Sequence, residues 1–362
     1  MDQALLFTLL AVFPFGRLLG HWPLDIVVGF AFLYTLFSKR KKSIAFKAFA
    51  GFALAAAFSY LVSVFILPAS ALATGSLYLF RLIAYWFLLD FCVNLTAKNP
   101  KIKPLIFKSL IAVAVAIAVF GWVQYFRYPD LTALKFLGWD DHLYRLVGSF
   151  LDPGFTGLFL GLGAVLSLGT GLALPGFFVI SLAFTYSRAG YLAFLAAMAF
   201  LVGKTKKAIL AILLLGVVVF CLPRPAGQGV NLLRAYSISS RLQNYVETLK
   251  TAGQSPVFGV GFNNICFYKG DATSHSCSGA DSSLLLILAT TGIVGLLIFA
   301  YSVRKLFKTI KRGVYFDVFV ASVLALGVHS LFVNSLFYPF TMAFFAILIS
   351  LQTFKGKSKA LK

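Results

Sequence analysis

Residues 273–300 read TSHSCSGADSSLLLILATTGIVGLLIFA and join the two kinds of sequence found in this chain. The first part ends a polar interval that begins at Arg224, the longest in an otherwise apolar sequence. The second part, 283–300, approaches the ~20 apolar residues that a helix needs to cross a bilayer. We therefore expect residues 224–295 to hold the working loop of an integral membrane protein, with the rest of the chain as its scaffold.

The composition indicates the same class of protein. Hydrophobic residues make up 60% of the chain and charged residues 12%, whereas soluble domains are about 25% charged. The mean hydropathy is +0.90. These values predict an all-α, polytopic helical membrane protein. The net charge of +21 is spread in short basic clusters between apolar runs, as the positive-inside rule produces, so we expect no nucleic-acid partner.

The apolar runs predict about 12 transmembrane helices. They cover approximately residues 4–15, 24–37, 45–67, 77–95, 105–125, 155–168, 174–186, 191–202, 208–222, 283–301, 315–333 and 336–351. The first run lacks a basic leader and a second run follows directly, so no cleavable signal peptide is expected.

The basic clusters predict the orientation of these helices. If the amino terminus is cytoplasmic, most of the 32 Lys and Arg residues fall on the cytoplasmic side and most of the 11 Asp and Glu residues on the other. Both termini are then cytoplasmic. The chain divides into N-terminal helices (1–125), a second transmembrane region (126–354) that includes an extracytoplasmic loop (223–281), and a basic cytoplasmic tail (355–362). Arg145, Arg188, Arg241 and Asp281 share the extracytoplasmic side.

Arg188 follows Ser187 at the junction of two apolar runs. A charge at membrane depth costs about 2.5 kcal/mol or more and usually has a function or a partner. The alternative is an arginine that extends to lipid headgroups, although the short Ser-Arg-Ala-Gly turn leaves it little room.

Arg241 follows two serines and precedes Leu242, Val246 and Leu249 at helical spacing. Ser239 or Ser240 could cap a helix on the membrane face, with Arg241 in its first turn. Two arginines on one side of a membrane suit a diphosphate, because the guanidinium group binds phosphate oxygens in a bidentate manner. The alternative for Arg241 is a solvated surface charge.

Asp281 stands directly before the predicted helix 283–301. It could cap that helix or act as a general base towards an acceptor hydroxyl. His275, in the same loop, could share or replace that role. His329 lies in a predicted membrane helix, where an ionisable group usually has a function.

Cys266 and Cys277 share the outer loop and could form a disulfide, since that side is oxidising in many bacteria. No His, Asp and Glu cluster has metal-ligand spacing, and no glycine-rich phosphate loop is present. We therefore expect neither a metal nor a cofactor.

Several short motifs resemble the O-antigen ligase and polymerase family. Residues 145–154, RLVGSFLDPG, resemble its R-x-x-G-x-F-x-x-P entry to a helix, and 185–190, TYSRAG, its S-R-x-G turn. Arg241 with 255–261, SPVFGVG, resembles an R…P-x-x-G-x-G loop. DSSLL at 281–285 with TGIVG at 291–295 resembles H/D-N/S-x-x-L…G-I/L-x-G, and His329 is also typical of the family.

The resemblance implies a membrane glycosyltransferase that is metal-independent and inverting. It would transfer a glycan from undecaprenyl diphosphate to a hydroxyl of a glycan, lipid or protein, on the outer face of the cytoplasmic membrane. Arg188 and Arg241 would match the arginines that hold the diphosphate, with help from Arg145. Lipopolysaccharide ligases have His where Asp281 stands, so the Asp is more like polymerases. The alternative function is a lipid-linked oligosaccharide flippase or another twelve-helix transporter.

Overall fold

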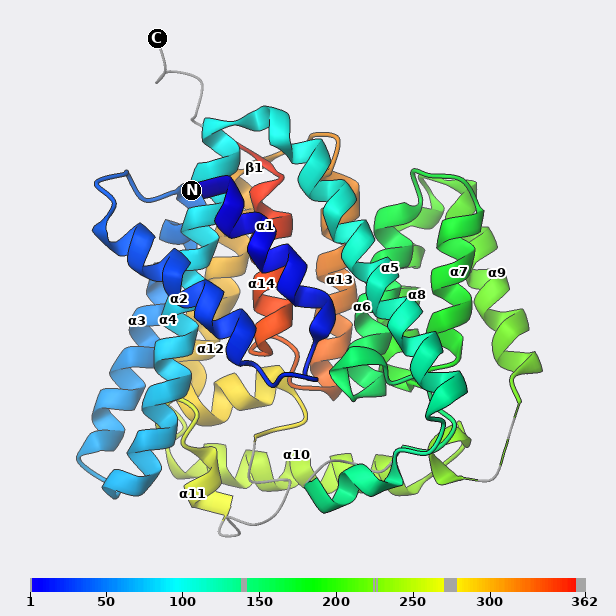
Figure 1. The fold of residues 1–362 in the computed structure, drawn as a ribbon. Helices are drawn as coiled ribbons and strands as arrows, with labels where there is room; N and C mark the ends of the chain where they lie inside the picture. Colours follow the sequence, from blue (N-terminus) through cyan, green and yellow to red (C-terminus); the bar gives the residue numbers. More distant parts are fainter. Residues whose placement is uncertain (1, 138–141, 224, 226, 270–278, 356–362) are drawn as a thin grey trace.

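The computed structural model describes residues 2–137, 142–223, 225, 227–269 and 279–355. Within these ranges the regular structure is helical apart from one pair of two-residue strands (Figure 1). Strands β1 (Ile310–Lys311) and β2 (Thr353–Phe354) pair antiparallel, with Ile310 opposite Phe354.

A helix lies at each of the apolar segments predicted above. These are α1 Asp2–Val12, α2 Trp22–Phe37, α3 Ile44–Val64, α4 Ala69–Lys98, α5 Lys103–Arg127, α6 Pro153–Ser167, α7 Ala173–Ala183, α8 Arg188–Val202, α9 Lys206–Cys221, α12 Ser283–Thr309, α13 Phe316–Phe332 and α14 Pro339–Ser350. Two further helices, α10 (Tyr236–Gln254) and α11 (Ile265–Lys269), lie in the long polar interval. Short 3-10 helices η1 to η5 cover Phe13–Phe15, Pro100–Ile102, Thr132–Leu137, Gly148–Phe150 and Gln228–Val230.

Four helical segments of the described chain are long and apolar enough to cross a membrane. They are Ile44–Val64, Ala69–Lys98, Pro100–Arg127 and Ser283–Thr309, and shorter apolar helices of 10–17 residues accompany them. The protein is therefore an all-α membrane protein, as its composition predicts. The number of membrane crossings stays a prediction.

The core lies between two short helices that are almost wholly buried, α6 and α14. Helix α6 packs against α5, α7, α8 and α13, whereas α14 packs against α2, α4 and α5. Aromatic side chains join the two groups: the Phe13 ring lies 5.4 Å from that of Phe159 and 5.3 Å from that of Phe340, both edge-on. Edge-on packing suits the charge distribution of aromatic rings, so this cluster fixes η1, which follows α1, against α6 and α14.

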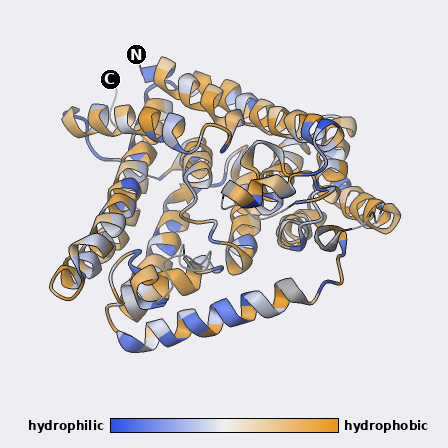
Figure 2. Ribbon diagram, turned by 60° about the horizontal axis from the view of Figure 1, so that its bottom comes forward, coloured by the Kyte–Doolittle hydropathy of each residue, from blue (hydrophilic) through white to orange (hydrophobic). Residues whose placement is uncertain are grey.

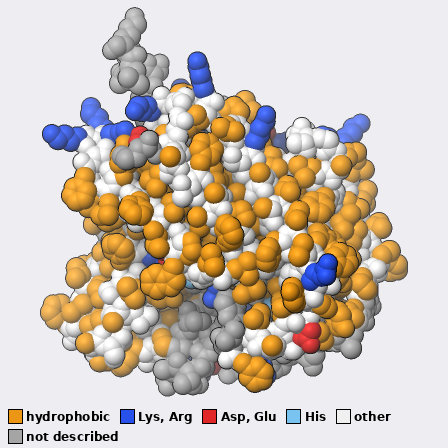
Figure 3. Space-filling view, in the orientation of Figure 1, with side chains coloured by type: hydrophobic (Ala, Val, Ile, Leu, Met, Phe, Trp, Pro, Cys, Tyr) orange, Lys and Arg blue, Asp and Glu red, His pale blue; other side chains and the backbone are white. Residues whose placement is uncertain are grey.

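The two ends of the molecule differ in character. The first and last described residues lie at one end, and α10 runs across the opposite end (Figure 1). Basic side chains gather along the end that holds these residues (Figure 3). We call this the basic end and the opposite one the α10 end. Which of them faces the cytoplasm stays a prediction.

Helix α10 differs from the prediction in two ways. It begins at Tyr236, after Ala235, and no side chain caps it. The expected cap by Ser239 or Ser240 is therefore wrong, and Arg241 lies in the second turn.

The polar face of α10 is the one that lies against the protein. Asn244, Thr248 and Thr251 are buried. Leu242, Val246 and Leu249 are 61%, 45% and 49% exposed and form an apolar stripe that points away from it. Figure 2 shows the hydrophilic and hydrophobic residues along this helix.

Candidate functional site

The turn between α7 and α8 places Arg188 at the α10 end. The Ser187 hydroxyl accepts a hydrogen bond from the Gly190 amide at 3.1 Å and caps α8. The residue before it, Tyr186, has a left-handed φ of 51°, which a tyrosine adopts only when its surroundings fix it. A Cβ at Gly190 would come within 3.2 Å of the Gly157 backbone. The S-R-x-G pattern is thus a capped helix start pressed against α6, with Arg188 as its first residue.

Arg188 extends from α8 to the polar interval that precedes α10. Its Nη1 donates hydrogen bonds to the carbonyls of Leu232, at 3.3 Å, and Arg234, at 3.2 Å. Arg188 therefore lies beside the backbone of Arg234, an arginine 46 positions further along the chain.

Arg188, Arg234 and Arg241 lie close enough for their charges to act on one another, and we call them the three-arginine cluster. Arg234 is half-buried and donates to the carbonyls of Gly229, at 2.8 Å, and Asn231, at 3.0 Å. Burial, and then the positive charges of Arg188 and Arg241, lower the pKa of Arg234. The three positive charges repel one another, and an anion bound among them would offset this repulsion. The cluster is therefore suited to an anionic ligand. No hydrogen bond or ion pair joins the Arg241 side chain to any other described residue.

Arg145 has a different environment from these three arginines. Only 8% of it is exposed. Its Nε donates to the Thr185 carbonyl at 3.0 Å, and its Nη2 to the Tyr186 carbonyl at 3.3 Å. These bonds hold the backbone of the α7–α8 turn, so the structure places Arg145 behind the turn that presents Arg188.

Asp281 precedes α12 without capping it. The cap is Ser282, whose hydroxyl accepts a hydrogen bond from the Leu285 amide. The helix-cap alternative for Asp281 is therefore wrong. The Asp281 amide donates to the Asn244 side chain of α10 at 2.9 Å, so α10 helps to hold the backbone at this position.

The charge of Asp281 acts on two polar side chains, Tyr245 of α10 and Lys269 of α11. Burial raises the pKa of Tyr245; the Asp281 carboxylate adds to this rise and the Arg241 charge opposes it. Burial lowers the pKa of Lys269, and the carboxylates of Glu247 and Asp281 oppose that shift. The Lys269 ammonium donates to the Gly279 carbonyl at 3.1 Å. Asp281 and Arg241 thus act on the same tyrosine, from two elements that are separate in the sequence.

The remaining glycine motifs meet at a break in α12. Gly292 has φ 67° and interrupts the helix. The amide of Val260 donates to the Ala289 carbonyl at 3.0 Å, and the amide of Ile293 to the Pro256 carbonyl at 2.9 Å. A Cβ at Gly259 would lie 2.3 Å from the Thr291 amide, so the loop fits only without a side chain there. The loop therefore supplies hydrogen bonds that the broken helix lacks, and it holds the first part of α12, the helix that follows Asp281.

His329 links two helices, and the functional role expected for it stays a prediction. It is fully buried, with Nε2 3.0 Å from the Gly154 carbonyl and Nδ1 2.5 Å from the Ser335 hydroxyl. It joins α13 to the start of α6. His275 and Cys277 lie outside the described residues, and Cys266 lies in α11. The base role of His275 and the Cys266–Cys277 disulfide stay predictions.

One family model, described as O-Antigen ligase, matches residues 173–300. This region is similar to the O-antigen ligase family. The resemblance shown by the motifs is thereby confirmed over about a third of the chain. No curated protein matches the sequence.

The O-antigen ligase region includes Arg188, Arg234, Arg241 and Asp281, but not Arg145. The sequence motifs did not identify Arg234, Tyr245 or Lys269 as candidate residues. Only Arg234 had a signal: a third arginine in the polar interval, seven positions before Arg241. In the described part of the chain, no three His, Cys, Asp or Glu side chains gather as metal ligands would.

Proposed function

We propose that the protein transfers a glycan from undecaprenyl diphosphate to an acceptor hydroxyl on the outer face of the cytoplasmic membrane. The O-antigen ligase region supports a membrane glycosyltransferase class. The observation that carries the finer proposal is the three-arginine cluster, whose member Arg241 acts on Tyr245 together with Asp281. In this proposal the α10 end is extracytoplasmic and the twelve apolar helices all lie in the membrane.

The three arginines bind the diphosphate of the donor. Guanidinium groups offer paired N–H donors to phosphate oxygens, and their charge stabilises the negative charge that develops on the leaving group. This accounts for transfer without a metal ion. Arg241, whose side chain is not committed to another described residue, has its donors available for this contact.

Asp281 is the proposed general base. It removes the proton from the acceptor hydroxyl, whose oxygen attacks the anomeric carbon. The bond from that carbon to the diphosphate oxygen breaks, and the configuration inverts. Undecaprenyl diphosphate and a new glycosidic bond are the products. The acid at this position favours a polymerase, in which the acceptor hydroxyl belongs to a second glycan.

In vitro transfer tests this proposal. Purified protein in detergent is given an undecaprenyl-diphosphate oligosaccharide and EDTA, and longer glycans and free lipid diphosphate are measured. Wild type should form both. Arg241→Ala and Asp281→Ala should form neither, whereas Arg304→Ala should retain activity because Arg304 is an exposed residue in the last part of α12.

Other outcomes would separate the alternatives. Release of lipid diphosphate only with an added lipid acceptor would indicate a ligase. If no acceptor yields product while the lipid-linked glycan crosses liposomes intact, the proposed transferase is wrong and the protein is a flippase.

A further inference from the structure

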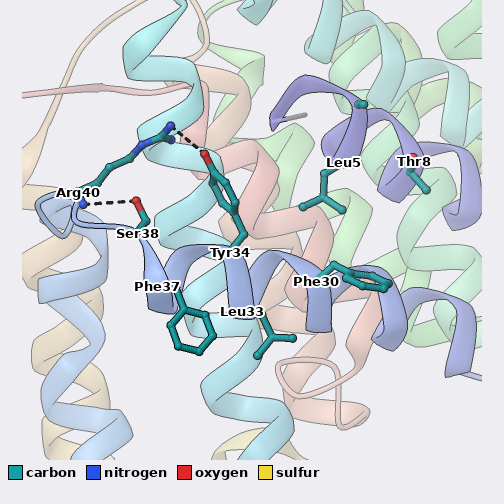
Figure 4. Close-up of a pocket in the computed structure, with 9 residues that line it drawn as sticks. Leu5, Thr8, Phe30, Leu33, Tyr34, Phe37, Ser38 and Arg40 are labelled. Carbon is teal, nitrogen blue, oxygen red and sulfur yellow. Dashed lines mark hydrogen bonds between the residues drawn. The ribbon is translucent and has the colours of Figure 1, made fainter.

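A groove runs between α1 and α2 at the basic end, far from the three-arginine cluster. Its volume is about 660 Å³, within the range of about 300–1,000 Å³ typical of ligand sites. Its walls are formed mainly by apolar side chains of the two helices, shown in Figure 4. The lining residues are Ala4, Leu5, Thr8, Phe30, Leu33, Tyr34, Phe37, Ser38 and Arg40.

The groove is open to the surroundings along its apolar walls. Phe30 and Phe37 line it and are 61% and 80% exposed. Both helices are short apolar helices that we propose to lie in the membrane, which places acyl chains around these walls. A lipid can therefore enter from the side without crossing a polar barrier.

The groove ends at a guanidinium group held in a fixed position. Nη2 of Arg40 donates to the Tyr34 hydroxyl at 2.9 Å (Figure 4). The same nitrogen donates to the Asp2 carboxylate at 3.0 Å. The guanidinium also lies 5.4 Å from the centre of the Tyr34 ring. An arginine has five N–H donors, and no other described residue accepts from Nε or Nη1 of Arg40. These donors are available for a phosphate.

The surrounding charges favour an anion. Lys39 and Lys41 are exposed beside Arg40. Two carboxylates oppose them: Asp2 pairs with Arg40, and Asp90 lies 3.6 Å from Lys42. Four basic residues against two carboxylates leave a positive balance at this end of the groove.

We propose that this groove binds one anionic phospholipid, with an acyl chain along Leu5, Phe30 and Leu33 and its phosphate on Arg40. Basic pockets between membrane helices are a recognised form of lipid headgroup site. The site lies at the opposite end from the proposed transferase centre, and it holds whether or not the protein transfers glycans.

Native mass spectrometry of the full chain tests the proposal. The protein in detergent is given dioleoylphosphatidylglycerol or dioleoylphosphatidylcholine at equal concentrations. We expect one bound phosphatidylglycerol and weaker phosphatidylcholine binding. Arg40→Gln should weaken phosphatidylglycerol binding about fivefold, the loss expected for one basic side chain at an anionic surface. Arg304→Gln should leave it unchanged.

Two variants test whether the groove holds the chain. Thr8 and Leu33 line it and are exposed, so Thr8→Trp or Leu33→Trp can fill it without displacing the core. Both should abolish phosphatidylglycerol binding. Leu213→Trp, at an exposed position on α9, is the matched control and should retain it.

Three results would overturn the proposal. Equal losses in Arg40→Gln and Arg304→Gln would mean a diffuse surface attraction. Unchanged binding in both groove-filling variants would mean that no acyl chain lies there. Competition by glycerol 1-phosphate as effective as that by the lipid would mean a phosphate site without a chain.

Discussion

At the scale of single residues, the arginines differ in what their side chains contact. Arg145 binds backbone carbonyls of the α7–α8 turn, and Arg188 and Arg234 bind those of the polar interval. Arg241 is held by no described hydrogen bond. The arginines therefore differ in how many of their N–H donors are used within the protein, and Arg241 is the one most available to a ligand.

The transfer activity should depend on the shape of the side chain at position 241 as well as on its charge. Arg241→Ala should lower kcat by about 10²–10³, the usual loss when a charge-stabilising donor is removed. Arg241→Lys should recover only part of this loss, because an ammonium group cannot reproduce the bidentate contact. Steady-state release of lipid diphosphate measures both. Full activity in the Lys variant would contradict a diphosphate-binding role.

Arg145 should affect stability in a way that Arg241 does not. Removing the Arg145 side chain leaves the Thr185 and Tyr186 carbonyls without a donor in a buried place, at a cost of about 1–3 kcal/mol. We expect a lower apparent Tm for Arg145→Ala in detergent and a wild-type Tm for Arg241→Ala. The reverse order would mean that Arg145 does not support the turn.

His21, which precedes α2, should make stability depend on pH. Burial, and then the charges of Arg17 and Arg81, lower its pKa to about 4 in the folded protein, from an ordinary value of 6.5. Between these values the unfolded chain binds a proton that the folded protein does not, so stability falls as the pH is lowered from 6.5 towards 4.

The apparent Tm of wild type and His21→Gln, compared at pH 7 and pH 5, measures this contribution. The wild type should lose more of its Tm on acidification than the variant, which cannot take up that proton. Equal losses would show that His21 titrates normally in the folded state.

The arginines of the candidate site differ in how readily the sequence identifies them. Arg188 was identifiable because a charged residue between two apolar runs is conspicuous, and Arg241 because apolar residues follow it at helical spacing. Arg234 was not identified as a candidate. It lies beside Arg188 because the Arg188 side chain donates hydrogen bonds to the carbonyls of Leu232 and Arg234. Such contacts between backbone and side chain leave no periodic signal in the sequence.

At the scale of elements, the break in α12 couples two motifs that are more than 30 positions apart in the sequence. The loop that contains Gly259 inserts at Gly292, where neither residue can carry a side chain. The apolar pattern predicts one continuous helix here, because a break held by a distant loop does not change hydrophobicity. The start of α10 was mispredicted for a related reason: it begins without a capping side chain.

Gly292→Ala should test this coupling. The new Cβ would lie 2.1 Å from the Val257 carbonyl oxygen, in a backbone conformation with positive φ. We expect a lower apparent Tm and reduced transfer, since the loop must move away from α12. A strained residue of this kind costs about 1–3 kcal/mol before any clash.

Gly216→Ala is the control for that change. Gly216 lies in α9, where a Cβ added to it would meet no atom within 4 Å, and alanine favours helices. Its Tm should be equal to or above that of wild type. A similar loss in both variants would contradict a specific role for the break.

At the scale of the whole molecule, charged and polar features divide between the two ends. Basic side chains mark the end that holds the first and last described residues, and α10 with the three-arginine cluster marks the other (Figures 1 and 3). The helix positions followed from apolar runs, because burial in lipid or core requires them. The sequence did not predict that the polar face of α10 lies against the protein, because an amphipathic pattern alone does not say which face of a helix is buried.

The stoichiometry of the reaction tests the central claim most directly. Purified wild-type protein is incubated with an undecaprenyl-diphosphate oligosaccharide in EDTA, and new glycosidic bonds and free undecaprenyl diphosphate are counted in the same sample. Glycan transfer by this site predicts one lipid diphosphate released for each bond formed, and neither product from Asp281→Ala. Lipid-linked glycan that remains intact, with no lipid diphosphate released under any acceptor condition, would contradict it.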